Sequence, residues 1–140
     1  MEFEDIRSFL QSNHRGVVNT RQPDGATQSS IVVCGAYEND LAFVSVRGRS
    51  LKVRNLRRDP TCTVLAVSDD WRSYAVVEGQ ARLHDATNTD AEQLRVLLRE
   101  VYRVCGDNDH PDWDEYDVAM RRQDAVVVLV RPERIYGLLR

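Results

Sequence analysis

The chain has 140 residues, of which 42% are hydrophobic and 29% are charged, and its formal net charge is -3. This length suits a single domain over residues 1–140, the composition excludes a disordered chain, and the acidic balance argues against a duplex nucleic acid as the partner. The acidic first residues, three scattered cysteines and the absence of an apolar run of about 20 residues predict a cytoplasmic protein with no signal peptide and no membrane span.

The first third of the chain predicts a helix followed by three strands. Apolar residues at helical spacing indicate a helix over residues 2–12. Strands are expected at 16–21 and 27–37, and the turn Gln22-Pro23-Asp24-Gly25 joins them into a hairpin, because proline fixes φ and Asp-Gly permits a tight reversal. A third apolar strand is expected at 41–46.

The next stretch, from Arg47 to Arg58, holds six basic residues and no acidic one, although acidic residues are in excess in the whole chain. Ser50 suits the N-cap of a short helix that Pro60 ends. A strand, a glycine-containing turn and a helix start together offer backbone N–H groups beside cations, which favours a bound phosphate. The alternative is a solvated basic helix face. Lys52 is the only lysine of the chain.

The second half predicts more strands and two helices. Strands are expected at 62–67 and 74–83, with a bulge at Gly79. A helix is expected around 94–102, with Thr89 and Glu92 as its capping box.

A second, short helix is expected around 116–120, and two final strands at 125–130 and 134–138 are expected to flank a turn at 131–133. The chain is therefore mainly β: we predict an antiparallel barrel of about six to seven strands with short helices as covers.

Several kinds of site are disfavoured. His14, His84 and His110 have no metal-ligand spacing, so no metal is expected, and the loop around His110 is interpreted as a polar surface loop. No dinucleotide, phosphate-loop or serine-hydrolase motif is present. Trp71 falls in a turn, where it either caps the barrel end or lies against a planar ring.

Five stretches, in order along the chain, resemble the pyridoxamine 5'-phosphate oxidase-like FMN-binding split β-barrel family, and most of all its PPOX-class coenzyme F420-dependent branch. The more specific ones are the K-x-R-N-L-R-R-D-P block at 52–60 and the S-Y-A-V-x-E-G block at 73–79. The supporting stretches are Gly16-Val17-Val18 with Asp24-Gly25, Asp112-Trp113-Asp114-Glu115-Tyr116 and Ile135-Tyr136-Gly137.

The resemblance implies a split barrel that forms a homodimer, with a cofactor site at each side of the interface. The cofactor would be coenzyme F420, or alternatively FMN. Position by position, it places Lys52, Arg47, Arg49 and Ser50 at the phosphate, with Ser45 at the end of the strand that leads to them. Gln28, Ser30 and Val32, which alternate along one strand and so share a face, would line the ring. Trp71 and Tyr74 would approach it from the other subunit or from the barrel end.

The function expected on this basis is that of an oxidoreductase, in which a reduced deazaflavin passes a hydride to an unsaturated small organic molecule. The same fold would also suit an FMN-binding flavin reductase or a barrel that binds a cofactor without catalysis. No acid–base pair is evident, so no catalytic residue is assigned. Tyr74 or Tyr136 would be the proton donors to consider, although each also suits a barrel core.

Overall fold

The computed structural model describes all 140 residues, in four helices and six strands. The helices are α1 (Phe3–Ser12), α2 (Leu51–Arg58), α3 (Ala91–Gly106) and α4 (Trp113–Arg122). The strands are β1 (Arg15–Arg21), β2 (Thr27–Tyr37), β3 (Asp40–Ser45), β4 (Thr61–Val67), β5 (Tyr74–His84) and β6 (Val126–Leu138).

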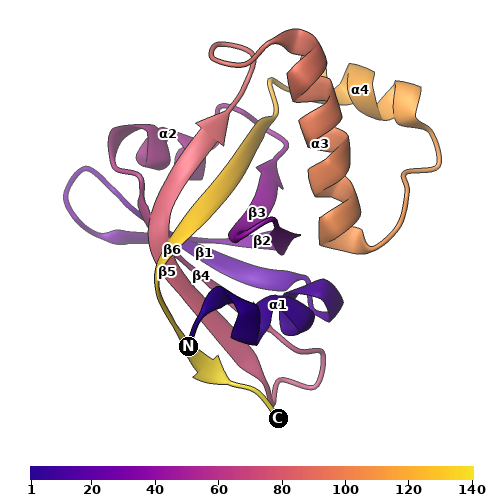
Figure 1. Cartoon of the computed structure of the whole chain (residues 1–140). Coiled ribbons are helices and arrows are strands. Elements are labelled where there is room, and N and C mark those ends of the chain that lie inside the picture. Colours follow the sequence, from indigo (N-terminus) through magenta and orange to yellow (C-terminus); the bar gives the residue numbers. More distant parts are fainter.

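The six strands form one closed antiparallel barrel in the order β1-β2-β3-β6-β5-β4. Helices α3 and α4 lie together on one side of this barrel, and both termini lie at its lower end in the view of Figure 1. The predicted class, a mainly β barrel with helical covers, is confirmed. Because the barrel is closed, each strand pairs with a neighbour on both sides and the sheet has no free edge strand.

The β1–β2 hairpin confirms the expected turn chemistry. Gly25 has a φ of 88°, a conformation that glycine adopts without steric cost. The Ala26 N–H donates to Oδ1 of Asp24 at 2.9 Å, which fixes the turn from within. The strand register that follows pairs Arg21 with Thr27.

The last strand corrects one prediction. The turn expected at 131–133 does not exist, and β6 continues without interruption from Val126 to Leu138. Pro132, the reason for expecting a break, pairs with Gly79, where the β5–β6 register shifts as predicted. A proline lacks the N–H that a regular ladder needs, so the bulge at Gly79 gives it a place in the sheet.

The start of α3 corrects a second prediction. Its N-cap is Asp90, whose carboxylate accepts hydrogen bonds from the backbone N–H groups of Glu92 and Gln93. The expected capping box of Thr89 and Glu92 is therefore wrong by one residue. Both assignments use the same chemistry, because an oxygen at the N-cap satisfies a free N–H of the first turn.

Two apolar clusters hold the molecule together. The larger, of 20 buried residues, fills the barrel and includes the inner side of α1 through Ile6 and Leu10, both fully buried. The smaller, of ten buried residues, lies between the outer face of β3 and β6 and the helices α3 and α4, with Val101 and Val127 at its centre. None of the four helices is long and apolar enough to cross a membrane.

Candidate functional site

The basic turn between β3 and α2 is held against the link between α4 and β6. The Gly48 N–H donates to the carbonyl oxygen of Gln123 at 3.0 Å. A Cβ on Gly48 would lie 2.0 Å from the carbonyl oxygen of Asp124, so no other residue fits there without movement of the backbone. The position of Arg47 and Arg49 is thus fixed by the close approach of two backbones.

Ser50 stands at the N-cap of α2, as predicted, but its side chain does not cap the helix. Its hydroxyl lies 3.1 Å from the hydroxyl of the buried Ser45, which also donates to the carbonyl oxygen of Arg47. The predicted N-cap position of Ser50 is confirmed, but its hydroxyl contacts Ser45 and not the N–H groups of the first turn. The consequence is that no side chain caps the N–H groups at the start of α2, where the helix dipole also favours an anion.

The cations at this end of the basic segment have no acidic partner. None of Arg47, Arg49, Lys52 and Arg54 belongs to an ion pair. Lys52 is half-buried, and desolvation lowers the pKa of its ammonium below the usual 10.5. A desolvated ammonium without a counter-ion is stabilised by any anion that reaches it.

The other end of the segment is different. The Arg57 guanidinium pairs with the buried Asp85 at 2.5 Å. Arg58 donates to the carbonyl oxygen of Arg21 and, at 3.2 Å, to Oδ1 of Asn55. Burial alone would raise the pKa of Asp85, but hydrogen bonds from Thr87 and Arg57 lower it overall. These arginines fasten α2 to the barrel.

A groove of about 670 Å³ opens beside the unpaired cations Arg47 and Lys52. Its volume is within the range of small-molecule and cofactor sites. Its lining is mainly apolar and comes from β2, β3, the basic turn, α3 and α4. The lining residues are Ile31, Val32, Val33, Val44, Ser45, Val46, Arg47, Ser50, Lys52, Val101, Tyr102, Cys105, Gly106, His110, Tyr116 and Met120.

The exposed apolar side chains of β2 form one part of this lining. Ile31 and Val33 are 85% and 60% exposed, although both are β-branched residues in the middle of a strand. Together with Val46 they present apolar surface to solvent next to a cationic turn. Adjacent apolar and cationic surfaces suit a ligand with a flat apolar part and an anionic tail.

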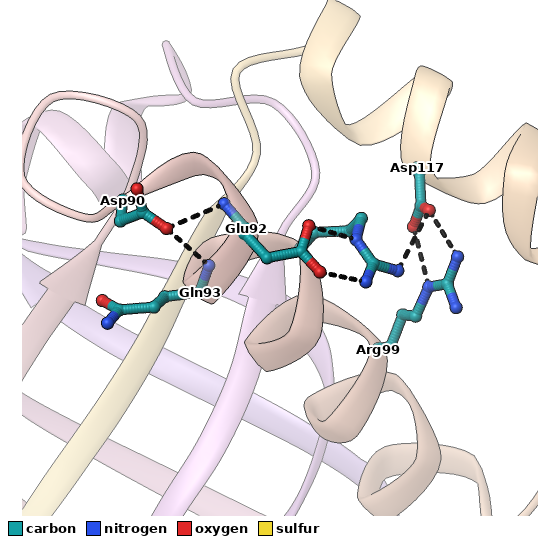
Figure 2. Close-up of polar contacts among 6 residues, drawn as sticks. Asp90, Glu92, Gln93, Arg99 and Asp117 are labelled. Carbon is teal, nitrogen blue, oxygen red and sulfur yellow. Dashed lines mark hydrogen bonds and ion pairs between the residues drawn. The ribbon is translucent and has the colours of Figure 1, made fainter.

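An ion-pair network holds the α3–α4 side of the groove in place. Figure 2 shows the carboxylate of Asp117 facing Arg99, whose Nε donates to it at 3.0 Å, while Asp90 caps the start of α3. The hydrogen bond from Arg99 lowers the pKa of Asp117, so this carboxylate stays charged. Arg95 bridges the network by contacting both Glu92 and Asp117. Two helices that share no backbone hydrogen bonds are thereby fixed relative to each other.

Five of the predicted site residues meet at the groove: Val32, Ser45, Arg47, Ser50 and Lys52. Gln28 and Ser30 share the inward face of β2 with Val32, as expected, but both side chains are hydrogen-bonded to other residues of the barrel. The Asn55 amide donates to Thr20, Thr20 donates to Gln28, and Gln28 donates to Ser30, at 3.0, 3.1 and 2.7 Å. This relay links α2 to β1 and β2.

The remaining three predicted residues do not line the groove within one chain. Arg49 is exposed on the basic turn, and Tyr74 is half-buried at the start of β5. Trp71 is 79% exposed with a φ of 66°, so the reading in which it covers the barrel end is wrong. Its contact with a ring, and that of Tyr74, stay predictions that involve a second subunit.

Sequence reasoning missed the residues that α3, α4 and their connecting loop bring to the groove. Three of them, Tyr102, His110 and Tyr116, form a cluster of rings with Trp113, which does not itself line the groove, and the ring centroids lie 5.1 to 5.9 Å apart. The sequence did contain a signal. Trp113 and Tyr116 are three residues apart on a short helix and so share one face, and Tyr102 adds a third aromatic residue on the preceding helix. The groove itself depends on helix packing, which leaves no local pattern.

A second hollow, of about 790 Å³, lies around the start of α1 and the middle of β6. Although larger, it is lined by charged and polar side chains, including Arg7, Arg82 and Arg131, and by only three hydrophobic residues. It lacks the apolar wall that a planar ring would need, so the groove at Lys52 is the better candidate for a cofactor.

The comparisons with known proteins agree with this fold. The family model described as pyridoxamine 5'-phosphate oxidase matches residues 3–139, and the chain therefore belongs to that family. The predicted family membership is confirmed.

Solved structures of similar proteins share the fold at low sequence identity. A conserved hypothetical protein from Mycobacterium tuberculosis is 21% identical with a TM-score of 0.77, over 99% of this chain and 84% of that one. A structure described as an F420 reductase is 20% identical with a TM-score of 0.64, over 93% and 94%. An FMN-binding protein from Nostoc punctiforme, described as related to pyridoxamine 5'-phosphate oxidase, is 14% identical with a TM-score of 0.64, over 96% and 79%.

Proposed function

We propose that this protein is an F420-dependent oxidoreductase that reduces an unsaturated small organic molecule. The observation that carries the proposal is Lys52: a half-buried ammonium without a counter-ion, next to an uncapped helix start and an apolar groove of about 670 Å³. A phosphate would supply the missing charge, and the groove has the volume and apolar lining that a tricyclic ring requires.

The residues divide into two roles. Lys52, Arg47, Arg49 and Ser50 would hold the phosphate end, and the buried Ser45 keeps Ser50 in place through their hydroxyl contact. Strand β2 would lie along the ring, with the exposed side chains of Ile31 and Val33 on the groove side and the predicted Val32 between them. When bound, a reduced deazaflavin supplies the hydride; the chain's own contribution is to orient the reactants and to exclude water.

A homodimer is part of the proposal. The exposed apolar side chains of Ile31 and Val33 would be covered by a second copy of the chain. In that arrangement Trp71 and Tyr74 of the second copy would complete the ring site, as the family resemblance implies. Gln28 and Ser30 could contact the ring only if their hydrogen bonds inside the barrel were broken. We therefore expect them to contribute less to ring binding than Val32 does.

FMN is the alternative cofactor, because it also joins a tricyclic ring to a phosphate and a protein of the same fold is described as FMN-binding. A barrel that binds either cofactor without catalysing a reaction would have the same groove. Titration of the protein with both flavins separates the first two possibilities. A subsequent screen of conjugated acceptors with the reduced cofactor separates an enzyme from a binding protein.

The first test replaces Lys52 with alanine and follows the fluorescence of the deazaflavin during titration. Removal of a charge-assisted contact to phosphate costs about 1.5 to 3 kcal/mol, so we expect affinity to fall roughly 10- to 150-fold. The matched control is Arg54→Ala, because Arg54 is a second unpaired cation of α2 but is exposed and does not line the groove. Equal affinity of the Lys52→Ala variant and the unmodified protein would refute the phosphate role.

The dimer is tested separately by sedimentation velocity. We expect a dimer in the unmodified protein and dissociation when Ile31 and Val33 are both replaced by glutamate, because like charges would then meet in the interface. A monomer that still binds the cofactor with full affinity would contradict the shared site.

A further inference from the structure

The part of the groove formed by α3, α4 and their connecting loop contains few free polar groups. The Tyr116 hydroxyl donates to the carbonyl oxygen of Leu98 at 3.0 Å, and the Cys105 thiol donates to that of Ala42 at 3.5 Å. Two lining residues remain with an uncommitted polar atom, His110 and Tyr102. Any specific polar contact with a ligand at this end must come from one of these two side chains or from the backbone.

The loop decides which nitrogen of His110 carries the proton. The Asp112 N–H donates to Nδ1 of His110 at 2.9 Å, so Nδ1 accepts and carries no hydrogen. The neutral ring must therefore hold its proton on Nε2, as an N–H donor that has no partner within the protein. No cluster of histidine, cysteine or acidic side chains that could hold a metal is present, so Nε2 is not positioned as a metal ligand.

The ring of His110 is also fixed in space. It lies 5.3 Å from the Tyr102 ring and 5.3 Å from the Tyr116 ring, centroid to centroid, and contacts Trp113 as well. Its hydrogen bond to Asp112 ties it to the N-cap of α4, whose own side chain accepts from the Glu115 N–H. A ring held on three sides by other rings and at one nitrogen by the backbone loses little further freedom when it binds a ligand.

We propose that His110 is a specificity-determining residue: its Nε2–H donates a hydrogen bond to a carbonyl oxygen of the molecule that is reduced in the groove. This inference rests on the proposed function and names the substrate class, a conjugated carbonyl compound with an apolar skeleton. An uncharged donor in an apolar lining selects a neutral acceptor oxygen, whereas the cations around Lys52 select an anion.

The same contact favours the reduction. When a hydride adds to the β-carbon of a conjugated carbonyl, the carbon–carbon π electrons move toward the carbonyl and negative charge develops on its oxygen. A hydrogen bond from Nε2–H to that oxygen stabilises the charge while His110 keeps its proton. The α-carbon takes a proton from water once the reduced molecule leaves the groove, so that the acceptor gains one hydride and one proton in total.

The tautomer is tested first, and this test needs neither cofactor nor substrate. Long-range ¹H–¹⁵N correlation spectra of the histidine side chains are recorded at about pH 8, above the ordinary histidine pKa of about 6.5. His110 is assigned from its loss in the His110→Phe variant. We expect the Nε2–H pattern. An Nδ1–H pattern would overturn the proposal whatever the function of the protein.

The contact is tested on the protein saturated with whichever flavin it binds, kept oxidised so that no turnover occurs. Cyclohex-2-enone is titrated and compared with cyclohexene, which has the same ring without oxygen. We expect only the enone to shift the His110 Nε2 resonance. Equal shifts with both compounds, or none with the enone, would overturn the proposal.

Variants assign the donor. His110→Phe keeps a ring in the aromatic cluster and removes the donor, and we expect it to bind the enone about fivefold more weakly. His110→Gln restores a donor near Nε2 and should recover most of that loss, which a merely structural role would not predict. Tyr102→Phe keeps the ring and removes the other free polar atom of this lining, so we expect it to cost less enone affinity than His110→Phe; an equal or larger loss in this variant would assign the contact to Tyr102 and refute ours. Failure of both flavins to bind would refute the proposed function while leaving the tautomer result intact.

Discussion

The two ends of the basic segment Arg47–Arg58 are both positively charged, but they differ in the groups that they contact. At the end nearest the helix start, Arg47 and Lys52 face the groove without an acidic partner. At the other end, Arg57 and Arg58 bind Asp85 and the β1 backbone. The cations that stabilise the fold have a partner within the protein, whereas the candidates for ligand binding have none and also line a groove.

The largest expected effect on flavin affinity comes from displacing the whole turn that carries the unpaired cations Arg47 and Arg49. Gly48→Ala would place a Cβ 2.0 Å from the carbonyl oxygen of Asp124, so the turn must shift or its contact with the link between α4 and β6 must open. We expect flavin affinity to fall below detection and the free energy of unfolding to fall by about 1 to 3 kcal/mol. Titration and urea unfolding measure the two. The control is Gly25→Ala, in the distant hairpin turn, where a Cβ has open space and only the positive φ is strained.

A smaller effect, on stability alone, is expected at the end of the segment where Arg57 and Arg58 have partners within the protein. Arg57→Ala leaves the buried carboxylate of Asp85 without its guanidinium. We expect the free energy of unfolding to fall by about 1 to 2 kcal/mol, with flavin affinity unchanged within about twofold, as measured by urea unfolding and fluorescence titration. If affinity fell as much as in Lys52→Ala, the two ends of the segment would be one functional unit and the comparison would fail.

The smallest effect concerns pH. Burial lowers the pKa of Lys52 in the folded protein below its value in the unfolded chain, so folding is opposed by the charged ammonium. As pH rises from the folded to the unfolded pKa, this penalty is lost, and the unmodified protein should gain stability relative to Lys52→Met. We expect a gain of well under about 1 kcal/mol, because the side chain is only half-buried.

Saturating flavin provides the matching control for the pH measurement. A phosphate beside Lys52 raises the pKa of the ammonium again, so the difference in slope between the two proteins should shrink when the ligand is bound. A slope that ligand does not change would mean that the phosphate is held elsewhere.

Much of the fold could be predicted because its signals are local. The Pro-Asp-Gly turn and the alternation of β2 identify the first hairpin, and Ser50 and Pro60 bound α2. The continuity of β6 could not be predicted, because whether Pro132 breaks a strand depends on the bulge that faces it from β5. That bulge was expected at Gly79, but nothing local says which residue will lie opposite.

The site divides in the same way. Its charged end is continuous in sequence, and so the residues from Ser45 to Lys52 could be chosen before the structure was known. The aromatic part and the rest of the apolar part come from α3, α4 and their connecting loop, about 50 to 70 residues further along, and packing alone brings them to the groove. The loop around His110 lies at the surface, as predicted, but the sequence does not reveal that His110 lines the groove or that the Asp112 N–H selects its tautomer.

The pairing of β6 has a consequence for how the chain is made. β6 bonds to β3 on one side and to β5 on the other, so until it is synthesised the other five strands form an open sheet whose two edges are β3 and β5. Each edge is a template for pairing with another nascent chain. The barrel thus cannot close before β6 is in place, and it closes through contacts of high sequence separation, which slow folding and leave the open sheet exposed to aggregation.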